Sequence, residues 1–103
     1  MTSATVVRYT TRPDAADENE RLIRAVFTQL AEERPGGMRY VAVRLDDGVS
    51  FVHVALFEGE DNPLPALEAF TGFASTVGSR CTEGPNPVNG TVIGDYGGVP
   101  PVG

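Results

Sequence analysis

The chain has 103 residues, of which 41% are hydrophobic and 21% are charged, the proportions of one ordinary globular domain. The formal net charge is −6, and the basic side chains are all arginines scattered among acidic residues, which argues against a nucleic-acid partner and against an anionic membrane surface. No apolar run approaches the roughly 20 residues of a membrane span, and no signal-peptide pattern opens the sequence, so we expect a cytoplasmic protein.

We expect a single domain over residues 1–103, with a folded core over about 4–96. The terminal segment GGVPPVG, residues 97–103, is expected to be flexible or to lie against a neighbour. The only cysteine, Cys81, has no partner for an internal disulfide, which agrees with a cytosolic protein. Arg80 precedes it and could make the thiol reactive by lowering its pKa; the alternative is an inert thiol.

The first two predicted elements are a strand and a long helix. Residues 4–10, ATVVRYT, are rich in β-branched and aromatic side chains, which predicts a strand. In the following segment Asp14 is a candidate helix N-cap, and acidic residues occupy the first turn, where the helix dipole favours negative charge. The apolar side chains recurring at helical spacing are Leu22, Ile23, Val26, Phe27, Leu30 and Ala31. Pro35 and the two glycines after it end this helix.

The next predicted elements are a hairpin and a second helix. Alternating runs at about 38–45 and 50–58 flank Asp46-Asp47-Gly48, which has the chemistry of a hairpin turn. A loop with Asn62-Pro63 leads into a helix weakened by two glycines. Its apolar side is formed by Leu67, Phe70, Phe73, Ala74 and Val77. The segment EGPNPVNG is predicted to be a loop, and TVIGDYG after it a short last strand.

The order of elements is β-α-β-β-α-β, which predicts the ferredoxin-like α+β fold. This fold has a four-stranded antiparallel sheet with both helices on one face and with the first and third strands in the centre. The other face of the sheet is bare unless something covers it.

In this order the chain resembles the dimeric α+β-barrel superfamily, and specifically the small proteins related to antibiotic biosynthesis monooxygenases. The resemblance rests on "TVVRYTTRP" leading into an acidic helix start, and on "ERPGGMRYVAVRLDDGVSFVHVALFE", where helix end, Pro-Gly, strand, turn and strand follow the family's order. It covers roughly residues 4–96. It implies a homodimer through the sheet face, in which two sheets close into a barrel with the helices outside.

The family also implies possible activities. Some members oxidise quinol-like or polycyclic aromatic substrates with oxygen and without metal or flavin, related proteins degrade haem, and many have no known activity. The oxygenases and haem degraders commonly place a tryptophan in the active site, and this chain has none. Haem-degrading members take a ligand histidine from the second helix, and the segment PALEAFTGFASTVGSRC has none either. The resemblance therefore implies no cofactor, and one histidine and one cysteine far apart make a zinc or iron site improbable.

Strand alternation divides the sheet residues between two faces. We expect the wholly aliphatic set Val52, Val54 and Leu56 to pack under the helices. The side chains then expected on the opposite face, at the dimer interface, are Arg8, Tyr40, Arg44 and His53.

His53, the only histidine, is the first candidate for chemistry, because an imidazole can take or give a proton near pH 7. A nearby arginine such as Arg8 would favour its neutral form. The alternative is a buried interface histidine bonded to a neighbour across the barrel. Arg8 and Arg44 are candidates to bind an anionic or carbonyl oxygen, or else to form ion pairs with an acid such as Glu58 or Asp95.

Aromatic residues are the candidates for ligand contact. Tyr9 and Tyr40 could orient a phenolic substrate, although tyrosine is also common at interfaces. Phe27, Phe70 and Phe73 could line an apolar cavity between helices and sheet, or could simply be core.

Two functions of different classes follow. The first is a cofactor-independent monooxygenase-like enzyme for a small aromatic or quinol-type molecule, with His53 as base or hydrogen-bond partner and Arg8 stabilising negative charge. Tyr40, Arg44 and the phenylalanines would contact the substrate. The second is a non-catalytic dimeric module that binds a small apolar molecule or stabilises a partner. The sequence leaves open whether the protein is an enzyme.

Overall fold

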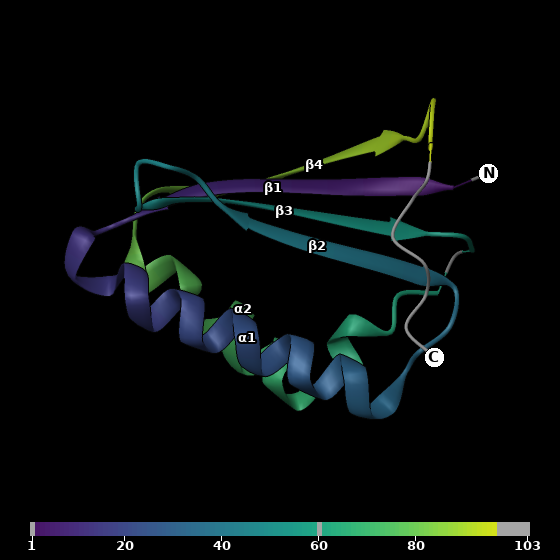
Figure 1. Ribbon diagram of the computed structural model, residues 1–103, viewed down its shortest axis with the longest axis horizontal. Coiled ribbons are helices and arrows are strands. Elements are labelled where there is room, and N and C mark those ends of the chain that lie inside the picture. Colours follow the sequence, from purple (N-terminus) through teal and green to yellow (C-terminus); the bar gives the residue numbers. More distant parts are fainter. Residues whose placement is uncertain (1, 60, 97–103) are drawn as a thin grey trace.

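The computed structural model describes residues 2–59 and 61–96, which form a four-stranded antiparallel sheet with two helices packed on one face (Figure 1). The elements are β1 (Ser3–Thr11), α1 (Ala16–Glu33), β2 (Met38–Arg44), β3 (Ser50–Phe57), α2 (Glu68–Arg80) and β4 (Cys81–Thr91). The strand order is β2-β3-β1-β4, so the first and third strands are central. The predicted ferredoxin-like α+β fold is confirmed.

The ends of the helices follow local chemistry. A short 3-10 turn, Pro13–Ala15, precedes α1, and Asp14 does not cap the helix as predicted, since its carboxylate pairs with Arg12 at 3.2 Å. At the other end Arg34 adopts a left-handed conformation, φ 47°, and its N–H donates to the carbonyl of Leu30. This closes the helix where the sequence predicted its end.

The β2–β3 hairpin is held by its turn, which was predicted. The Asp47 carboxylate accepts hydrogen bonds from the backbone N–H groups of Val49 and Ser50 and from the Ser50 hydroxyl. Gly48 has φ +80°, a conformation that glycine adopts without steric cost. The turn thereby sets the register that pairs Arg44 with Phe51.

On β2 and β3 the faces of the sheet are the reverse of the sequence-based expectation, whereas Arg8 of β1 lies on the outer face as expected. Strand pairing places Tyr40 opposite Ala55 and Val7 opposite His53, on the side that meets the helices. His53 is buried there, together with Phe51 and Phe57, whereas Val52 and Val54 lie on the outer face. Both alternating sets of β3 are largely apolar, so a period of two could not distinguish them. The larger aromatic side chains fill the space between sheet and helices.

The last strand also differs from the prediction, because residues 81–91 form β4 and the segment EGPNPVNG lies within it. Pairing with β1 along most of its length gives this segment its extended conformation. Two prolines are tolerated because β4 is an edge strand, where some N–H groups have no partner strand. The predicted strand from residue 91 onward begins where β4 ends, and the predicted tail 97–103 lies outside the described residues.

The core lies between the sheet and the two helices. Its main cluster is formed by Tyr9, Ala16, Ile23, Val26, Phe51, Phe73 and Val77. A second cluster at the other end contains Ala55, Phe57, Leu64 and Leu67. In the part of the chain that the structure describes, no helix has the length and apolarity to cross a membrane.

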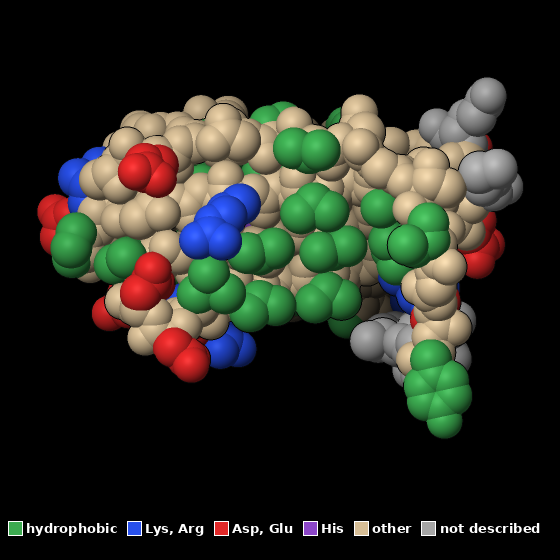
Figure 2. Space-filling model, turned by 90° about the horizontal axis from the view of Figure 1, so that it is seen from above, with side chains coloured by type: hydrophobic (Ala, Val, Ile, Leu, Met, Phe, Trp, Pro, Cys, Tyr) green, Lys and Arg blue, Asp and Glu red, His purple; other side chains and the backbone are tan. Residues whose placement is uncertain are grey.

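The outer face of the sheet carries a patch of aliphatic side chains (Figure 2). Val43 is 45% and Val88 63% exposed, and Val6 and Val41 are also exposed. Arg8, opposite Val52, belongs to this face. We call this surface, formed by Val6, Val41, Val43 and Val88 with the half-buried Val52, Val54 and Leu56, the outer valine face.

Candidate functional site

His53 lies at the centre of a hydrogen-bonded group that spans three neighbouring strands. Its side chain comes from β3 and is only 4% exposed. Nε2 is 2.7 Å from the hydroxyl of Tyr9 on β1, and Nδ1 is 2.7 Å from the hydroxyl of Tyr40 on β2. Both ring nitrogens of the buried imidazole therefore have partners.

The group continues from Tyr9 into both helices. The Nδ2 amide group of Asn19 in α1 donates to the Tyr9 hydroxyl at 2.9 Å. The Asn19 Oδ1 atom in turn accepts from Nε of Arg80, at the end of α2, also at 2.9 Å. Arg80 donates from Nη1 to the hydroxyl of Thr76, and its guanidinium lies over the ring of Phe73, 5.5 Å from the centroid. We call the series Arg80, Asn19, Tyr9, His53 and Tyr40 the buried relay.

Burial sets the protonation states in the buried relay. It lowers the pKa of His53 from 6.5 to about 4, because the imidazolium form would lose its hydration. It raises the pKa of Tyr40 to about 12 and that of Tyr9 further, because a phenolate would suffer the same penalty. All three side chains are consequently neutral at pH 7, and each is able to donate a hydrogen bond.

A cavity of about 270 Å³ lies beside the buried relay, between the sheet, α2 and β4. Its apolar walls include Phe57, Leu64, Phe70, Phe73 and Val77, with Pro85 and Pro87 on the side of β4. Its polar groups include Tyr9, Tyr40, His53 and Asn62. An apolar space with a few polar groups is typical of sites for small organic ligands.

The structure brings together five of the eight residues proposed from the sequence. The cavity is lined by Tyr9, Tyr40, His53, Phe70 and Phe73. Phe27 supports it from outside, since its ring stacks on that of Tyr40 with centroids 5.1 Å apart.

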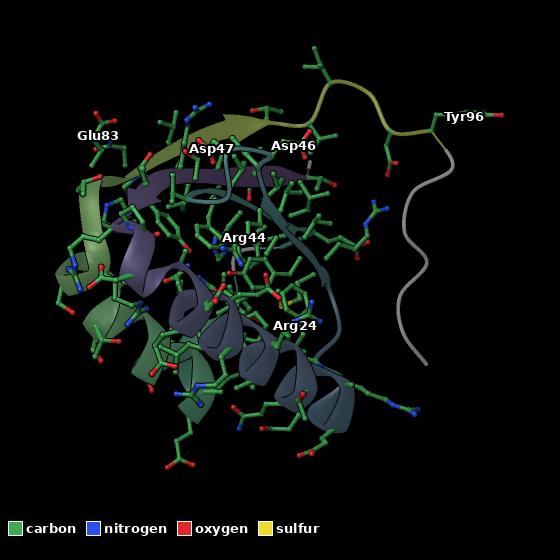
Figure 3. All side chains as sticks on the ribbon, turned by 60° about the vertical axis from the view of Figure 1, so that its left-hand side comes forward. Arg24, Arg44, Asp46, Asp47, Glu83 and Tyr96 are labelled. Atoms are coloured by element: carbon green, nitrogen blue, oxygen red, sulfur yellow. The ribbon has the colours of Figure 1, made fainter. Side chains whose placement is uncertain are left out.

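Arg8 and Arg44 lie elsewhere. Arg8 is on the outer valine face, so the sheet separates it from His53, contrary to the expected pairing. Arg44 extends from β2 toward α1 (Figure 3). There it pairs with Asp17 and Glu20 at 3.1 and 3.0 Å, rather than with the predicted Glu58 or Asp95.

Sequence reasoning missed Asn19 and Arg80. A usable signal was present, because Asn19 stands at helical spacing with Ile23 and Val26, and Arg80 stands likewise with Phe73 and Val77. A polar residue on a stripe that is otherwise buried needs a partner inside the protein.

The thiol of Cys81 shows no sign of activation. It is partly buried and lies 3.2 Å from the carbonyl oxygen of Val77. Burial raises its pKa, and this outweighs the opposite effect of Arg80. These observations favour the inert thiol over the reactive one.

Comparisons with known proteins add the fold relationship. No family model matches the sequence, and no curated protein sequence matches it. Solved structures do share the fold. Rv0793 from Mycobacterium tuberculosis superimposes with a TM-score of 0.73 and 18% identity, over 92% of this chain and 98% of its own.

Two further structures carry a described activity. A proposed antibiotic biosynthesis monooxygenase from Nitrosomonas europaea has a TM-score of 0.74 and 18% identity, over 88% of this chain and 98% of its own. SnoaB from Streptomyces nogalater, a cofactor-independent oxygenase, has a TM-score of 0.67 and 20% identity, over 94% of this chain and 98% of its own. The fold of the chain is thus that of antibiotic biosynthesis monooxygenase structures, as the sequence resemblance implied.

Proposed function

We propose that this chain, which has the fold of antibiotic biosynthesis monooxygenase structures, is a cofactor-independent monooxygenase-like protein that oxidises a small aromatic or quinol-type molecule. The observation that carries the proposal is the apolar cavity of about 270 Å³ whose polar end is formed by His53 and its two tyrosine partners. The volume is slightly below the roughly 300 Å³ at which typical ligand pockets begin, which suits a small aromatic molecule.

The reaction requires little of the protein beyond binding the substrate. In such a reaction the substrate supplies all four electrons that dioxygen takes up. One oxygen atom enters the ring as a carbonyl and the other leaves as water, so that 1-naphthol and O₂ give 1,4-naphthoquinone and H₂O. Phe70 and Phe73 would exclude water from the ring, and the polar end would hold the substrate oxygen.

Oxygen uptake with 1-naphthol tests this function. We expect consumption of O₂ above the uncatalysed rate, with one naphthoquinone formed per O₂. Replacing His53→Ala should slow turnover at least tenfold, about 1.4 kcal/mol of barrier, because the polar end of the cavity is lost. Ser75→Ala on the exposed side of α2 should leave the rate unchanged. If the rate of oxygen uptake is the same in the His53→Ala variant as in the wild type, the proposed role of this site is contradicted.

A second function rests on the same cavity. Both ring nitrogens of His53 are already paired with buried tyrosine hydroxyls, which suits a rigid polar end for binding alone. On this reading the protein is a non-catalytic module that binds a small apolar or aromatic molecule. Binding of naphthalene or 1-naphthol without oxygen uptake would select it.

We further propose that the protein is a homodimer through the outer valine face. Val43 and Val88 are 45% and 63% exposed and lie with other valines on one face of the sheet. Together they form an apolar patch that would be in contact with water in a monomer. A second copy offers the same flat aliphatic surface and covers it in a symmetric interface. The family resemblance supports this arrangement.

A further inference from the structure

We propose that Tyr40 selects ligands by hydrogen-bond direction: the buried relay leaves its hydroxyl hydrogen free for an acceptor oxygen of the ligand, a carbonyl or a deprotonated phenol. This inference rests on the proposed function, because it assumes that the cavity binds an organic ligand. It follows from the direction in which each hydrogen bond of the relay must run.

The direction is set at Arg80. A guanidinium donates hydrogen bonds and accepts none. Nε of Arg80 lies 2.9 Å from Asn19, so the amide atom facing it is the oxygen. This fixes an orientation that is ambiguous for most amides. Asn19, which is completely buried, therefore presents its NH₂ group to Tyr9.

The hydrogen bond between Tyr9 and His53 runs in the same direction, with Tyr9 as the donor. Its hydroxyl oxygen already accepts the hydrogen bond from Asn19 and has one hydrogen of its own to donate. His53 Nε2, at 2.7 Å, is the acceptor beside it among the described residues. Tyr9 is only 2% exposed and Nε2 lies within hydrogen-bond distance of its hydroxyl, so the hydroxyl donates to Nε2.

The imidazole then determines the state of Tyr40. A neutral imidazole carries one hydrogen and one acceptor lone pair in its plane. With Nε2 accepting from Tyr9, the hydrogen is on Nδ1 and is donated to the Tyr40 oxygen at 2.7 Å. The Tyr40 hydroxyl hydrogen makes no bond to His53, and none to another side chain in the ranges 2–59 and 61–96. Tyr40 lines the cavity, where this hydrogen can meet a ligand.

The opposite direction is disfavoured. If His53 carried its hydrogen on Nε2, it would donate to Tyr9, whose oxygen would then accept two hydrogen bonds. The Tyr9 hydrogen would be left buried without an acceptor, which costs free energy. The imidazolium form would also leave the Tyr9 hydrogen without an acceptor, because both of its ring nitrogens donate. Burial lowers the pKa of His53 to about 4, so this form is absent at pH 7.

Tyr40 therefore offers the cavity a hydroxyl hydrogen that no protein group uses. A ketone, a quinone carbonyl or a phenolate oxygen matches it, and binding would favour the deprotonated form of a phenolic substrate over the protonated form. In this arrangement His53 positions Tyr40 and does not itself remove a proton from the ligand.

The tautomer of His53 tests the direction without any ligand. Because the chain contains one histidine, the ring nitrogens of a ¹⁵N-labelled sample give a single pair of NMR signals. At pH 7 we expect the hydrogen on Nδ1 and none on Nε2. A hydrogen on Nε2, or on both nitrogens, overturns the inference.

Asn19→Asp should reverse the relay. The carboxylate accepts from Arg80 and also from the Tyr9 hydroxyl, to which it has no hydrogen to give. Tyr9 would then accept from His53, so the tautomer should move to Nε2–H. Thr76→Val is the matched control, because it removes the other side-chain bond of Arg80 without touching the relay, and the tautomer should stay on Nδ1. An unchanged tautomer in a folded Asn19→Asp protein contradicts the proposed direction.

Ligand binding provides the third measurement. The probes are 1-tetralone, which has a carbonyl oxygen and no hydroxyl, and tetralin, which has neither. Tyr40→Phe should weaken the binding of 1-tetralone roughly 3- to 10-fold, which corresponds to the loss of one hydrogen bond. The affinity for tetralin should be unchanged. Equal changes for both probes would overturn the role of Tyr40. If the wild-type protein binds neither probe, the proposed function fails, whereas the tautomer still decides the direction of the relay.

Discussion

At the scale of single residues, His53 shows how burial fixes a charge state. The imidazole is packed between Tyr9, Tyr40 and Phe73, with ring centroids 5.3 to 5.8 Å apart. Its pKa is about 4 in the folded protein, against an ordinary value near 6.5 in the unfolded chain. Between these two values the unfolded state binds a proton that the folded state excludes.

Stability should consequently fall as the pH drops from 6.5 to 4. The free energy of unfolding rises with pH wherever the unfolded state holds more protons than the folded state. The difference between the two pKa values of His53 corresponds to a change of roughly 3 kcal/mol in this free energy over the window. Urea denaturation at several pH values, in wild type and in His53→Gln, measures the effect. The carboxyl groups are common to both proteins, so the difference between the two curves isolates His53. Parallel curves would mean that the imidazole is not buried in its neutral form.

At the scale of elements, β4 depends on a glycine where it bends against β1. The pairing shifts register between Arg8 and Thr10, which marks a bulge. Gly84 lies there with φ +79°, and a Cβ atom at this position would come 2.9 Å from the carbonyl oxygen of Arg8. Gly90, in the same strand, has open space at its Cβ position. The edge strand that borders the cavity is therefore anchored at one specific backbone position.

Gly84→Ala should destabilise the protein by at least about 1 kcal/mol, because the alanine would be strained in φ and would overlap backbone. Gly90→Ala is the control and should change the free energy of unfolding by no more than about 0.5 kcal/mol. Urea denaturation compares the two variants. Similar values for both would show that β4 does not need the bulge.

At the scale of the whole molecule, the sheet has one covered and one uncovered face. The helices and the buried relay occupy the inner side, and the outer valine face is left to solvent in a single chain (Figures 1 and 2). The cavity lies on the inner side, and Pro85 and Pro87 of β4 form part of its wall. The proposed ligand site and the proposed dimer interface thus lie on opposite faces of the same sheet.

A single charge on the outer valine face should separate the proposed dimer. We expect the wild-type protein to sediment at twice the 10.9 kDa of one chain. Val43→Glu should give the mass of one chain, because a carboxylate would be buried without a partner in the interface. Thr28→Glu, on the exposed side of α1, should remain dimeric. A wild-type protein with the mass of one chain would contradict the interface.

The sequence by itself determined the order of the elements, the long helix and its end at Arg34, and the turn at Asp47-Gly48. These features depend on side-chain spacing and turn chemistry within a few residues, which a local pattern records. His53, Tyr40, Phe70 and Phe73 were also identified as candidates, because residue type alone selects them.

Only the tertiary structure decided which face of the sheet meets the helices, since both faces of β3 are apolar and the choice depends on the volume left beneath α1 and α2. It also decided that residues 81–91 form a strand, because pairing with β1 overrides two prolines. The buried relay joins positions 9, 19, 40, 53 and 80 through hydrogen bonds. Such contacts exist only once five elements have packed together, and no spacing along the chain encodes them.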